Sequence, residues 1–547
     1  MKRKKIATGA LIGGLITTPL IAITFLAERL AGFSFLPFDV FSWMTRILPG
    51  PLVTLGIDLM IDSLRLLNIN VADTAKTAEQ AMAVLQFLAI GVLAGAIYFG
   101  FLHSQQRKAT ITTGLLLGLI FVLPAVLISQ IVDDTALSPA VNGIWQAALF
   151  LLWGVSMSLI YNQLQRYQEE TEPQETDLKQ PFVEKLDRRQ FLITLGASAA
   201  TITVIGAGLG TLLNRDKADG QRTADGDGDT SIFPDPRPLP NADDPVKPAA
   251  GTRQEYTPVA DHYQVFIGLQ PENIDASAWT LPITGLVDNP LELTLEDIQT
   301  NYEPISRYIT LSCISGRIPT TLISTTYWTG ASVQDILEDA GVQEEAAYLY
   351  IRSEDGFYET VPLDLIHADP RIMFCYGWDG KPLPKDHGFP LRIWIPDRFG
   401  MKQPKWITSV EVIAEYKEGY WVERDWDRIA RIKTRSVIDS VAVEDTFEDD
   451  GQRYVPIGGI SFAGDRGISN VELRVDDGPW QKAQLRSPLS DATWVIWRYD
   501  WPFQAGEHTF QVRCYDGKGE LQVTEDSPAR PDGATGIHTI EQNIQDT

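Results

Sequence analysis

The sequence predicts a multi-domain protein: an α-helical transmembrane domain, an α+β domain and a β-sandwich. Residues 1–215 hold several apolar runs of about 20 residues, the length that a helix needs to cross a bilayer. Short β-type and helical runs alternate over 256–432, and strand patterns separated by turn residues fill 433–547. The stretch 216–255, rich in Asp, Gly and Pro, is predicted to be a disordered linker. A chain of 547 residues is long enough for this organisation.

Charge and cysteine content exclude several kinds of function. A net charge of -25 argues against nucleic acid as a partner, because a phosphate-binding surface needs a basic face. Cys313, Cys375 and Cys514 lie far apart, which gives no disulfide framework, zinc knuckle or c-type haem motif. Cys375 and Cys514 stand in apolar strand-like runs and are expected in the core. Cys313 differs because its surroundings are polar.

The membrane half is predicted to cross the bilayer five times. The predicted crossings are 6–31, 81–102, 110–132, 140–162 and 191–213. A sixth apolar run, 47–67, carries Asp58, Asp62 and Arg65 on one helical face and is expected to lie along the membrane–water interface.

The distribution of basic residues orients these crossings. The MKRKK start, Arg107 with Lys108, and Lys179–Arg189 are all expected on the cytoplasmic side. Five crossings then place everything after residue 213 outside the cytoplasm, so we expect a multi-pass cell-membrane protein with extracytoplasmic domains. A transporter regulated by those domains is an alternative that depends only on the number of crossings.

The last crossing is preceded by Asp187-Arg188-Arg189-Gln190-Phe191-Leu192, which resembles a twin-arginine export signal. Ordinary positive-inside flanking charge is the alternative. The segment has no persuasive cleavage site and is expected to stay as an anchor. His103 is the only histidine before residue 262, so no bis-histidine haem is expected in this half.

Cys313 follows a β-type run, Tyr308–Ser312, and is delivered into a polar loop. The helix after the loop has a capping pair, Ser332 with Asp335, and closes at Gly341. A cysteine so placed is either a small core side chain or a ligand or nucleophile.

Basic residues concentrate between Lys381 and Lys405 in an otherwise acidic region. Such a cluster is either a solvated basic face or a site for an anionic ligand. Its members are Lys381, Lys385, His387, Arg392, Arg398, Lys402 and Lys405.

Two of these segments resemble the sulfite oxidase family of molybdopterin enzymes. LSCIS, a loop and YWTG are similar to the family's cysteine segment, and His387-Gly388-Phe389-Pro390-Leu391-Arg392 with Lys405-Trp406 to its pterin-binding stretch. The resemblance implies a molybdenum–molybdopterin cofactor with Cys313 as its metal ligand and as a catalytic residue. It also implies cofactor contacts from His387, Arg392, Gln403 and Lys405, and at weaker positions from Tyr263, Gln264 and Ser353.

The chain departs from the family where the substrate binds. The family has an arginine in the segment matching Val265–Gly268, and paired arginines after the cysteine where this chain has only Arg317. The family's tyrosine aligns with Phe357, one residue before Tyr358. Sulfite needs cationic donors, so the substrate is expected to be either a small oxo-anion or an S-oxide, with Arg317 and Tyr358 as candidate catalytic contacts.

The C-terminal strands NVELRVDDGPW, ATWVIWRYDW and HTFQVRCYDGKG resemble the immunoglobulin-like dimerisation domain of that family, which implies a homodimer. The main hypothesis is a membrane-anchored, extracytoplasmic oxidoreductase of the sulfite oxidase type. The alternatives are reduction of an S-oxide or similar oxo compound, and a non-catalytic binding ectodomain that keeps the fold. The electron-transfer partner stays open.

Overall fold

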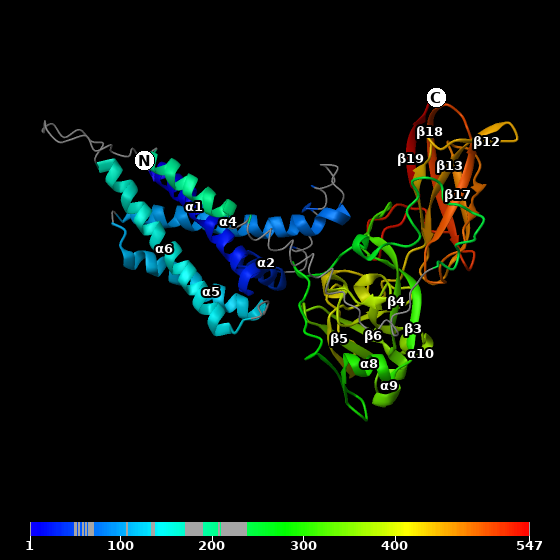
Figure 1. The fold of residues 1–547 in the computed structure, drawn as a ribbon, viewed down its shortest axis with the longest axis horizontal. Helices are drawn as coiled ribbons and strands as arrows, with labels where there is room; N and C mark the ends of the chain where they lie inside the picture. Colours follow the sequence, from blue (N-terminus) through cyan, green and yellow to red (C-terminus); the bar gives the residue numbers. More distant parts are fainter. Residues whose placement is uncertain are drawn as a thin grey trace. The chain divides into compact units, whose positions relative to one another are not determined.

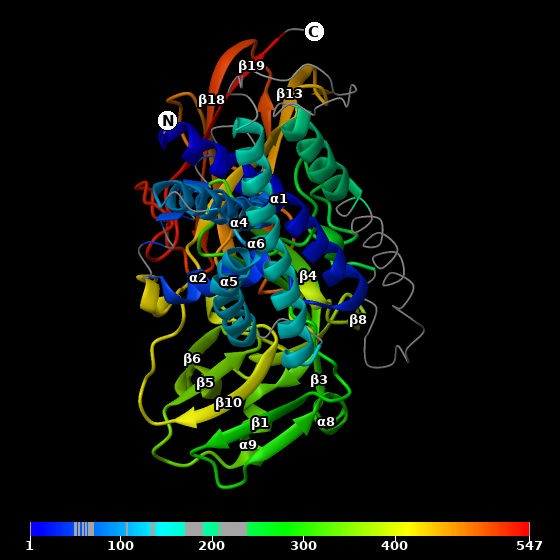
Figure 2. The same ribbon diagram turned by 90° about the vertical axis from the view of Figure 1, so that its left-hand side faces the viewer.

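A computed structural model describes residues 2–48, 71–105, 108–132, 137–169, 190–205 and 238–545, together with isolated helical positions between 52 and 63 and at 208. The chain forms two compact units, one of residues 1–53 with 75–226 and the other of residues 54–74 with 227–547. Figures 1 and 2 show both units in ribbon form. The predicted interface helix 47–67 and the twin-arginine stretch 187–189 lie largely or wholly outside the described residues.

The first unit is a bundle of helices. Its labelled helices are α1 (Lys2–Ala31), α2 (Leu36–Ile47), α4 (Val71–Ser104), α5 (Ile111–Val132) and α6 (Pro139–Glu169). Four segments of these helices are long and apolar enough to cross a membrane: Lys5–Ala31, Lys76–Ser104, Ile111–Val132 and Pro139–Arg166. The fifth expected crossing is described only as a shorter apolar helix, Gln190–Ile205, because most of its predicted second half lies outside the described residues.

Small residues let the membrane helices approach closely. Gly9 and Gly13 on α1 face Gly91 and Gly95 on α4, where a Cβ added to Gly95 would lie 2.2 Å from the Gly9 carbonyl oxygen. This is the spacing of a GxxxG contact on both helices. Replacing a glycine there would force the two helices apart.

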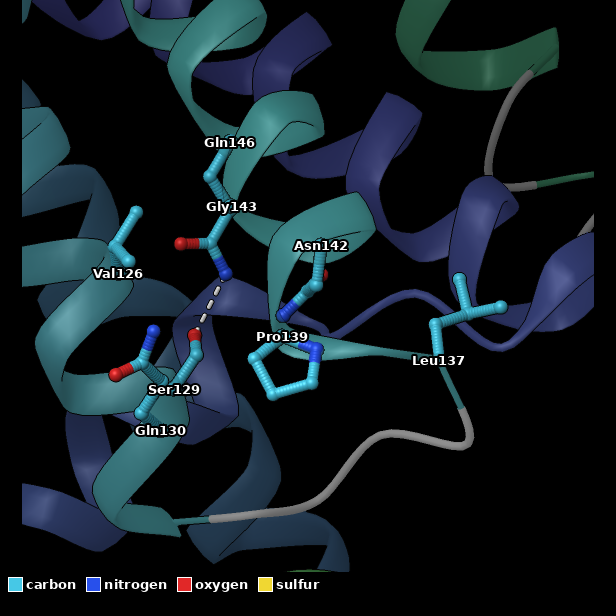
Figure 3. Close-up of a pocket in the computed structure, with 8 residues that line it drawn as sticks. All are labelled: Val126, Ser129, Gln130, Leu137, Pro139, Asn142, Gly143 and Gln146. Atoms are coloured by element: carbon cyan, nitrogen blue, oxygen red, sulfur yellow. Dashed lines mark hydrogen bonds between the residues drawn. The ribbon is translucent and has the colours of Figure 1, made fainter.

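A polar network is buried between α2, α5 and α6. Gln146 donates from Nε2 to Ser129 Oγ (2.7 Å), and Ser129 donates to Asp39 Oδ2 (2.5 Å). Gln146 and Asn142 also bond Ser34, beside a cavity of about 10 Å³ drawn in Figure 3. A cavity of this size has room for about one water molecule. The hydrogen bonds join helices that apolar packing alone would hold less specifically.

The first half of the second unit contains two five-stranded sheets. One sheet has the order β2-β1-β10-β5-β6 and the other β3-β4-β7-β8, with β9 paired to β7. Helix α9 fills the core with Val333, Ile336 and Leu337; as predicted, Ser332 accepts from the Asp335 N–H, and Gly341 ends the helix in the left-handed conformation. The strands are β1 (Thr280–Gly285), β2 (Leu291–Thr294), β3 (Pro304–Ser312), β4 (Ile323–Ser332), β5 (Tyr348–Ser353), β6 (Tyr358–Pro362), β7 (Met373–Trp378), β8 (Lys381–Pro382), β9 (Arg392–Trp394) and β10 (Ile407–Ile413), and the helices are α8 (Leu295–Asn301), α9 (Val333–Ala340) and α10 (Leu363–Ala368).

The second half of this unit is built from two antiparallel sheets that share one core. Their orders are β11-β13-β17-β16, with β12 beside β13, and β15-β14-β18-β19. Trp497, Phe510 and Cys514 lie fully buried between them. The strands are β11 (Arg435–Val441), β12 (Phe447–Asp449), β13 (Gln452–Phe462), β14 (Ile468–Val475), β15 (Gln481–Lys482), β16 (Gln484–Leu485), β17 (Val495–Pro502), β18 (Gly506–Asp516) and β19 (His538–Ile544).

The end of the predicted linker is not a solvated tether. Residues 238–255 pack around buried Arg486, which donates to the carbonyl oxygens of Asn241 (2.8 Å) and Val246 (2.9 Å) and to Glu255 Oε1 (2.6 Å). A desolvated guanidinium needs these acceptors, and the polar composition that suggested disorder supplies them. Residues 216–237 lie outside the described residues.

Candidate functional site

Cys313 lies immediately after β3, where the strand enters the loop to β4. Its N–H donates to the Leu322 carbonyl oxygen (3.0 Å), which closes the base of the loop. The side chain is largely buried, and Sγ lies 3.1 Å from Ser315 Oγ. Burial raises the pKa of the Cys313 thiol, while the Ser315 contact and the charge of Arg435 act in the opposite direction. Cys375 and Cys514 are fully buried core residues, as expected.

His387 and Arg392 form the centre of a buried basic and aromatic cluster. Arg392 donates from Nη1 to the His387 carbonyl oxygen (3.0 Å), and its guanidinium lies 4.6 Å from the Trp328 ring centroid and 5.3 Å from that of Trp378. The His387 ring is 4.6 Å from Trp378 and 5.0 Å from His262. Aromatic faces thus stabilise a cation that has been removed from water.

Several polar atoms in this region are buried and have no hydrogen-bond partner among the described residues. A buried polar atom without a partner costs about 1–3 kcal/mol, so each of these atoms would gain from a bound group that supplies its hydrogen bond. They are His262 Nε2, Ser353 Oγ, Arg392 Nε, Gln403 Oε1 and Arg435 Nε.

Both histidines of the cluster are neutral at physiological pH. Burial lowers the pKa of His262 to about 3, and the positive charges of Arg392 and Lys405 act in the same direction. Burial also lowers the pKa of His387 well below its ordinary value. Their free ring nitrogens are therefore hydrogen-bonding groups for a ligand, and the charge comes from Arg392 and Lys405.

Lys405 extends the cluster toward the turn at 385–388. Its Nζ donates to the Asp386 carbonyl oxygen (3.4 Å) and lies over the rings of Phe266 and Trp406. A Cβ added to Gly388 (φ 114°) would lie 2.9 Å from Lys405 Cβ, so only glycine allows this turn to fit beneath the lysine.

The remaining predicted contacts, Tyr263, Gln403 and Gln264, differ in how far they are buried. The half-buried Tyr263 donates its N–H to Ser324 Oγ (3.2 Å), and burial, with the Cys313 charge, raises the pKa of its phenol. Gln403 is anchored by Nε2 to the Arg398 carbonyl oxygen (2.8 Å), with Oε1 unpartnered. Gln264 is exposed and donates to Asp386 Oδ2 (3.2 Å).

The two candidate substrate contacts come from two different elements. Arg317 is exposed on the loop after Cys313. Tyr358 begins β6 in the other sheet, where its hydroxyl donates to Glu423 Oε2 (2.5 Å) and its ring faces Tyr420.

Three features of the site have no clear sequence signal. Arg435, which lies 123 residues after Ser312, donates to the Oγ of that serine, the residue before Cys313. His262 stands against His387 at the end of a short 3₁₀ helix, Val259–Asp261. Lys402 and Glu359 form a buried ion pair beside Gln403. Each depends on a long-range contact, although the positive charge of Lys402 was part of the predicted cluster.

Comparison with known proteins identifies the family. The model of the oxidoreductase molybdopterin binding domain matches residues 268–421. An uncharacterised oxidoreductase, YuiH, from Bacillus subtilis (strain 168) is 34% identical over 149 residues, which cover 27% of this chain and 71% of the relative. Mitochondrial sulfite oxidase from Macaca fascicularis is 27% identical over 287 residues, 44% of this chain and 52% of that protein. The chain belongs to the sulfite oxidase family.

As a member of this family the protein is a molybdenum-dependent oxidoreductase, and the matches leave its substrate unspecified. The chain spans about half, 52%, of the mitochondrial sulfite oxidase. The crystal structure of the sulfane dehydrogenase SoxCD from Paracoccus pantotrophus superimposes with a TM-score of 0.46 at 20% identity, covering 54% of this chain and 85% of that one. That overlay is too distant to support an argument about the site.

Proposed function

We propose that this family member is a membrane-anchored, extracytoplasmic enzyme in which the Cys313 thiolate holds molybdenum and the His387–Lys405 cluster holds the pterin. The observation that carries the proposal is the set of buried unpartnered atoms on His262, Arg392 and Gln403. The same domain holds Cys313 at the end of a strand, where its backbone N–H is fixed by a hydrogen bond.

The donor set fits a molybdopterin. Arg392 and Lys405 supply positive charge for the phosphate of the group, and the guanidinium can donate from its unpartnered Nε. The neutral rings of His262 and His387 offer hydrogen bonds without adding charge. Gly388 lets the turn pack directly against the side chains of Lys405 and Arg392. When bound, the group supplies two-electron oxo transfer at the metal.

The chain's own residues orient the reactants. The backbone bond from Cys313 to Leu322 fixes the loop that carries the sulfur, and burial excludes water around it. A thiol is deprotonated when it coordinates a metal, so the raised pKa of Cys313 does not oppose ligation. The Ser315 hydroxyl lies 3.1 Å from the sulfur and can donate to the resulting thiolate.

Reduction of an S-oxide is the second candidate reaction. It is favoured by the missing cations: Val265, in the segment where the family has an arginine, is exposed and apolar, and the exposed Arg317 is the one arginine of the loop. An S-oxide is neutral and does not need the donors that hold a sulfite dianion.

The location is proposed from the membrane helices and the charges that flank them. Four segments are long enough to span a bilayer, and the MKRKK start favours a cytoplasmic N-terminus. The two-sheet domain that ends the chain is proposed to be immunoglobulin-like and to mediate a homodimer.

The experiment is metal and pterin analysis of the full chain in detergent, with Cys313→Ser and the matched control Cys514→Ser. We expect about one molybdenum per chain in the parent and in the control, whose sulfur contacts Gln522 in the sandwich, and loss of molybdenum in Cys313→Ser. Absence of molybdenum from the parent after expression in a cofactor-producing host would refute the proposal. Sulfite oxidation compared with S-oxide reduction on the same preparation separates the two reactions.

A further inference from the structure

Strand β3, which leads into Cys313, lies at the edge of its sheet, and the C-terminal domain covers that edge. The Thr310 N–H donates to the Ala492 carbonyl oxygen (3.0 Å), and the Trp494 N–H donates to Thr310 Oγ1 (2.9 Å). Ser490 Oγ donates to the Tyr308 carbonyl oxygen (2.6 Å). An edge strand needs partners for its backbone groups, and here a loop of the second domain supplies them.

Arg435 continues this row of contacts to the residue before the cysteine. It is the first residue of β11, is almost fully buried and donates from Nη2 to Ser312 Oγ (2.5 Å). Its guanidinium lies 5.5 Å from the Phe399 ring centroid. The C-terminal domain therefore places a cation directly behind the strand end that presents Cys313.

Among the described residues this cation donates to the Ser312 hydroxyl and forms no ion pair with a carboxylate, and its Nε is buried without a hydrogen bond. Burial lowers the pKa of Arg435 to about 10, so the side chain stays charged at neutral pH. Removing a guanidinium from water is costly, and one neutral hydroxyl and one aromatic ring do not offset that cost. Two groups interact favourably with this cation, the Tyr263 phenol and the Cys313 sulfur, and the sulfur becomes anionic when it binds a metal.

We propose that Arg435 is a positioning residue of the metal site, through which the C-terminal domain sets the reduction potential of the metal held by Cys313. The inference rests on the proposed function. A positive charge in a low-dielectric surrounding stabilises the more reduced, less positively charged state of a nearby metal. The site is therefore completed by a residue outside the 268–421 segment that defines the family.

The test compares Arg435→Gln, Arg435→Lys and the control Arg474→Gln in the full chain. Arg474 lies on β14 in the other sheet, where it donates to Gln511 Oε1 (2.6 Å). Molybdenum content and the midpoint potential from an EPR-monitored redox titration are measured for each variant. We expect a lower potential in Arg435→Gln, a potential near that of the parent in Arg435→Lys, and no change in Arg474→Gln.

A fourth variant, Ser312→Ala, separates the charge from the hydrogen bond, because it removes the partner hydroxyl and leaves the guanidinium in place. A potential near that of the parent in Ser312→Ala supports the proposal. Equal potentials in the parent and Arg435→Gln would overturn it, as would an equal defect in Arg435→Gln, Arg435→Lys and Ser312→Ala. A parent without molybdenum refutes instead the proposed function.

Discussion

The buried ion pair between Lys402 and Glu359 gives the sharpest stability prediction. Lys402 Nζ lies 2.6 Å from Glu359 Oε1, and the two side chains are 6% and 0% exposed. A Cβ added to Gly419 would lie 2.2 Å from the same oxygen, so the backbone closes the pair off from water. Glu359→Gln leaves Lys402 as an uncompensated buried charge, which is expected to cost about 3–5 kcal/mol.

Glu411→Gln is the matched control. Glu411 pairs with Lys417 at 3.4 Å, and their side chains are 38% and 47% exposed, so this pair is expected to contribute about 0–1 kcal/mol. The measurement is thermal unfolding of the full chain in detergent, followed by tryptophan fluorescence. At about 2–4 °C per kcal/mol for a domain of this size, Glu359→Gln should melt at least about 6 °C below the parent.

The double variant Glu359→Gln, Lys402→Met tests the cause of that loss. Removing the second charge eliminates the uncompensated cation, and an apolar replacement for a buried ion pair is often neutral. We expect most of the lost stability to return. The reasoning is wrong if Glu359→Gln costs no more than Glu411→Gln, or if the double variant is no more stable than the single one.

Three further predictions concern other parts of the chain. Gly388→Ala should reduce pterin content severalfold, measured by pterin fluorescence, because its Cβ would meet Lys405 at 2.9 Å; normal content would contradict this. Buried His538 accepts the Ile438 N–H, and burial lowers its pKa, so as pH falls below about 6.5 the unfolded chain gains a proton that the folded chain lacks. This residue should then lower the free energy of unfolding by up to about 1.4 kcal/mol for each unit of falling pH. In His538→Gln, the free energy of unfolding from denaturant titrations should depend less steeply on pH than in the parent. Gly95→Leu should lower the detergent melting temperature by separating two helices; an unchanged value would exclude the contact.

Local signals in the sequence predicted the elements around the site well. The capping pair Ser332–Asp335 and Gly341 defined α9 because caps act within a few residues of each other. The strand before Cys313 was equally visible as a short β-type run. These features depend on neighbouring residues, so periodicity and capping chemistry are enough to find them.

Long-range features could not be read in the same way. Nothing near Arg435 indicates that its partner is Ser312, since the contact exists only after two domains have packed. The ordered structure of residues 238–255 could not be predicted for the same reason. Its hydrogen-bond acceptors receive the guanidinium of Arg486, which lies more than 230 residues later in the chain. The role of Tyr358 stays a prediction, since its strand belongs to the sheet that does not contain β3 and its place in the sheet order does not decide what the side chain binds.

The unpartnered atoms of the site bear on how the protein gains its stability. At about 1–3 kcal/mol each, the orphaned groups of His262, Ser353, Arg392, Gln403 and Arg435 together approach the net stability of an ordinary domain, about 5–15 kcal/mol. A fold can keep such a set only if the rest of its core compensates or if a ligand that binds the folded state satisfies it. A ligand at 1,000 times its dissociation constant adds about 4.1 kcal/mol. The cofactor is therefore expected to act as part of the core of this domain as well as its reactive centre.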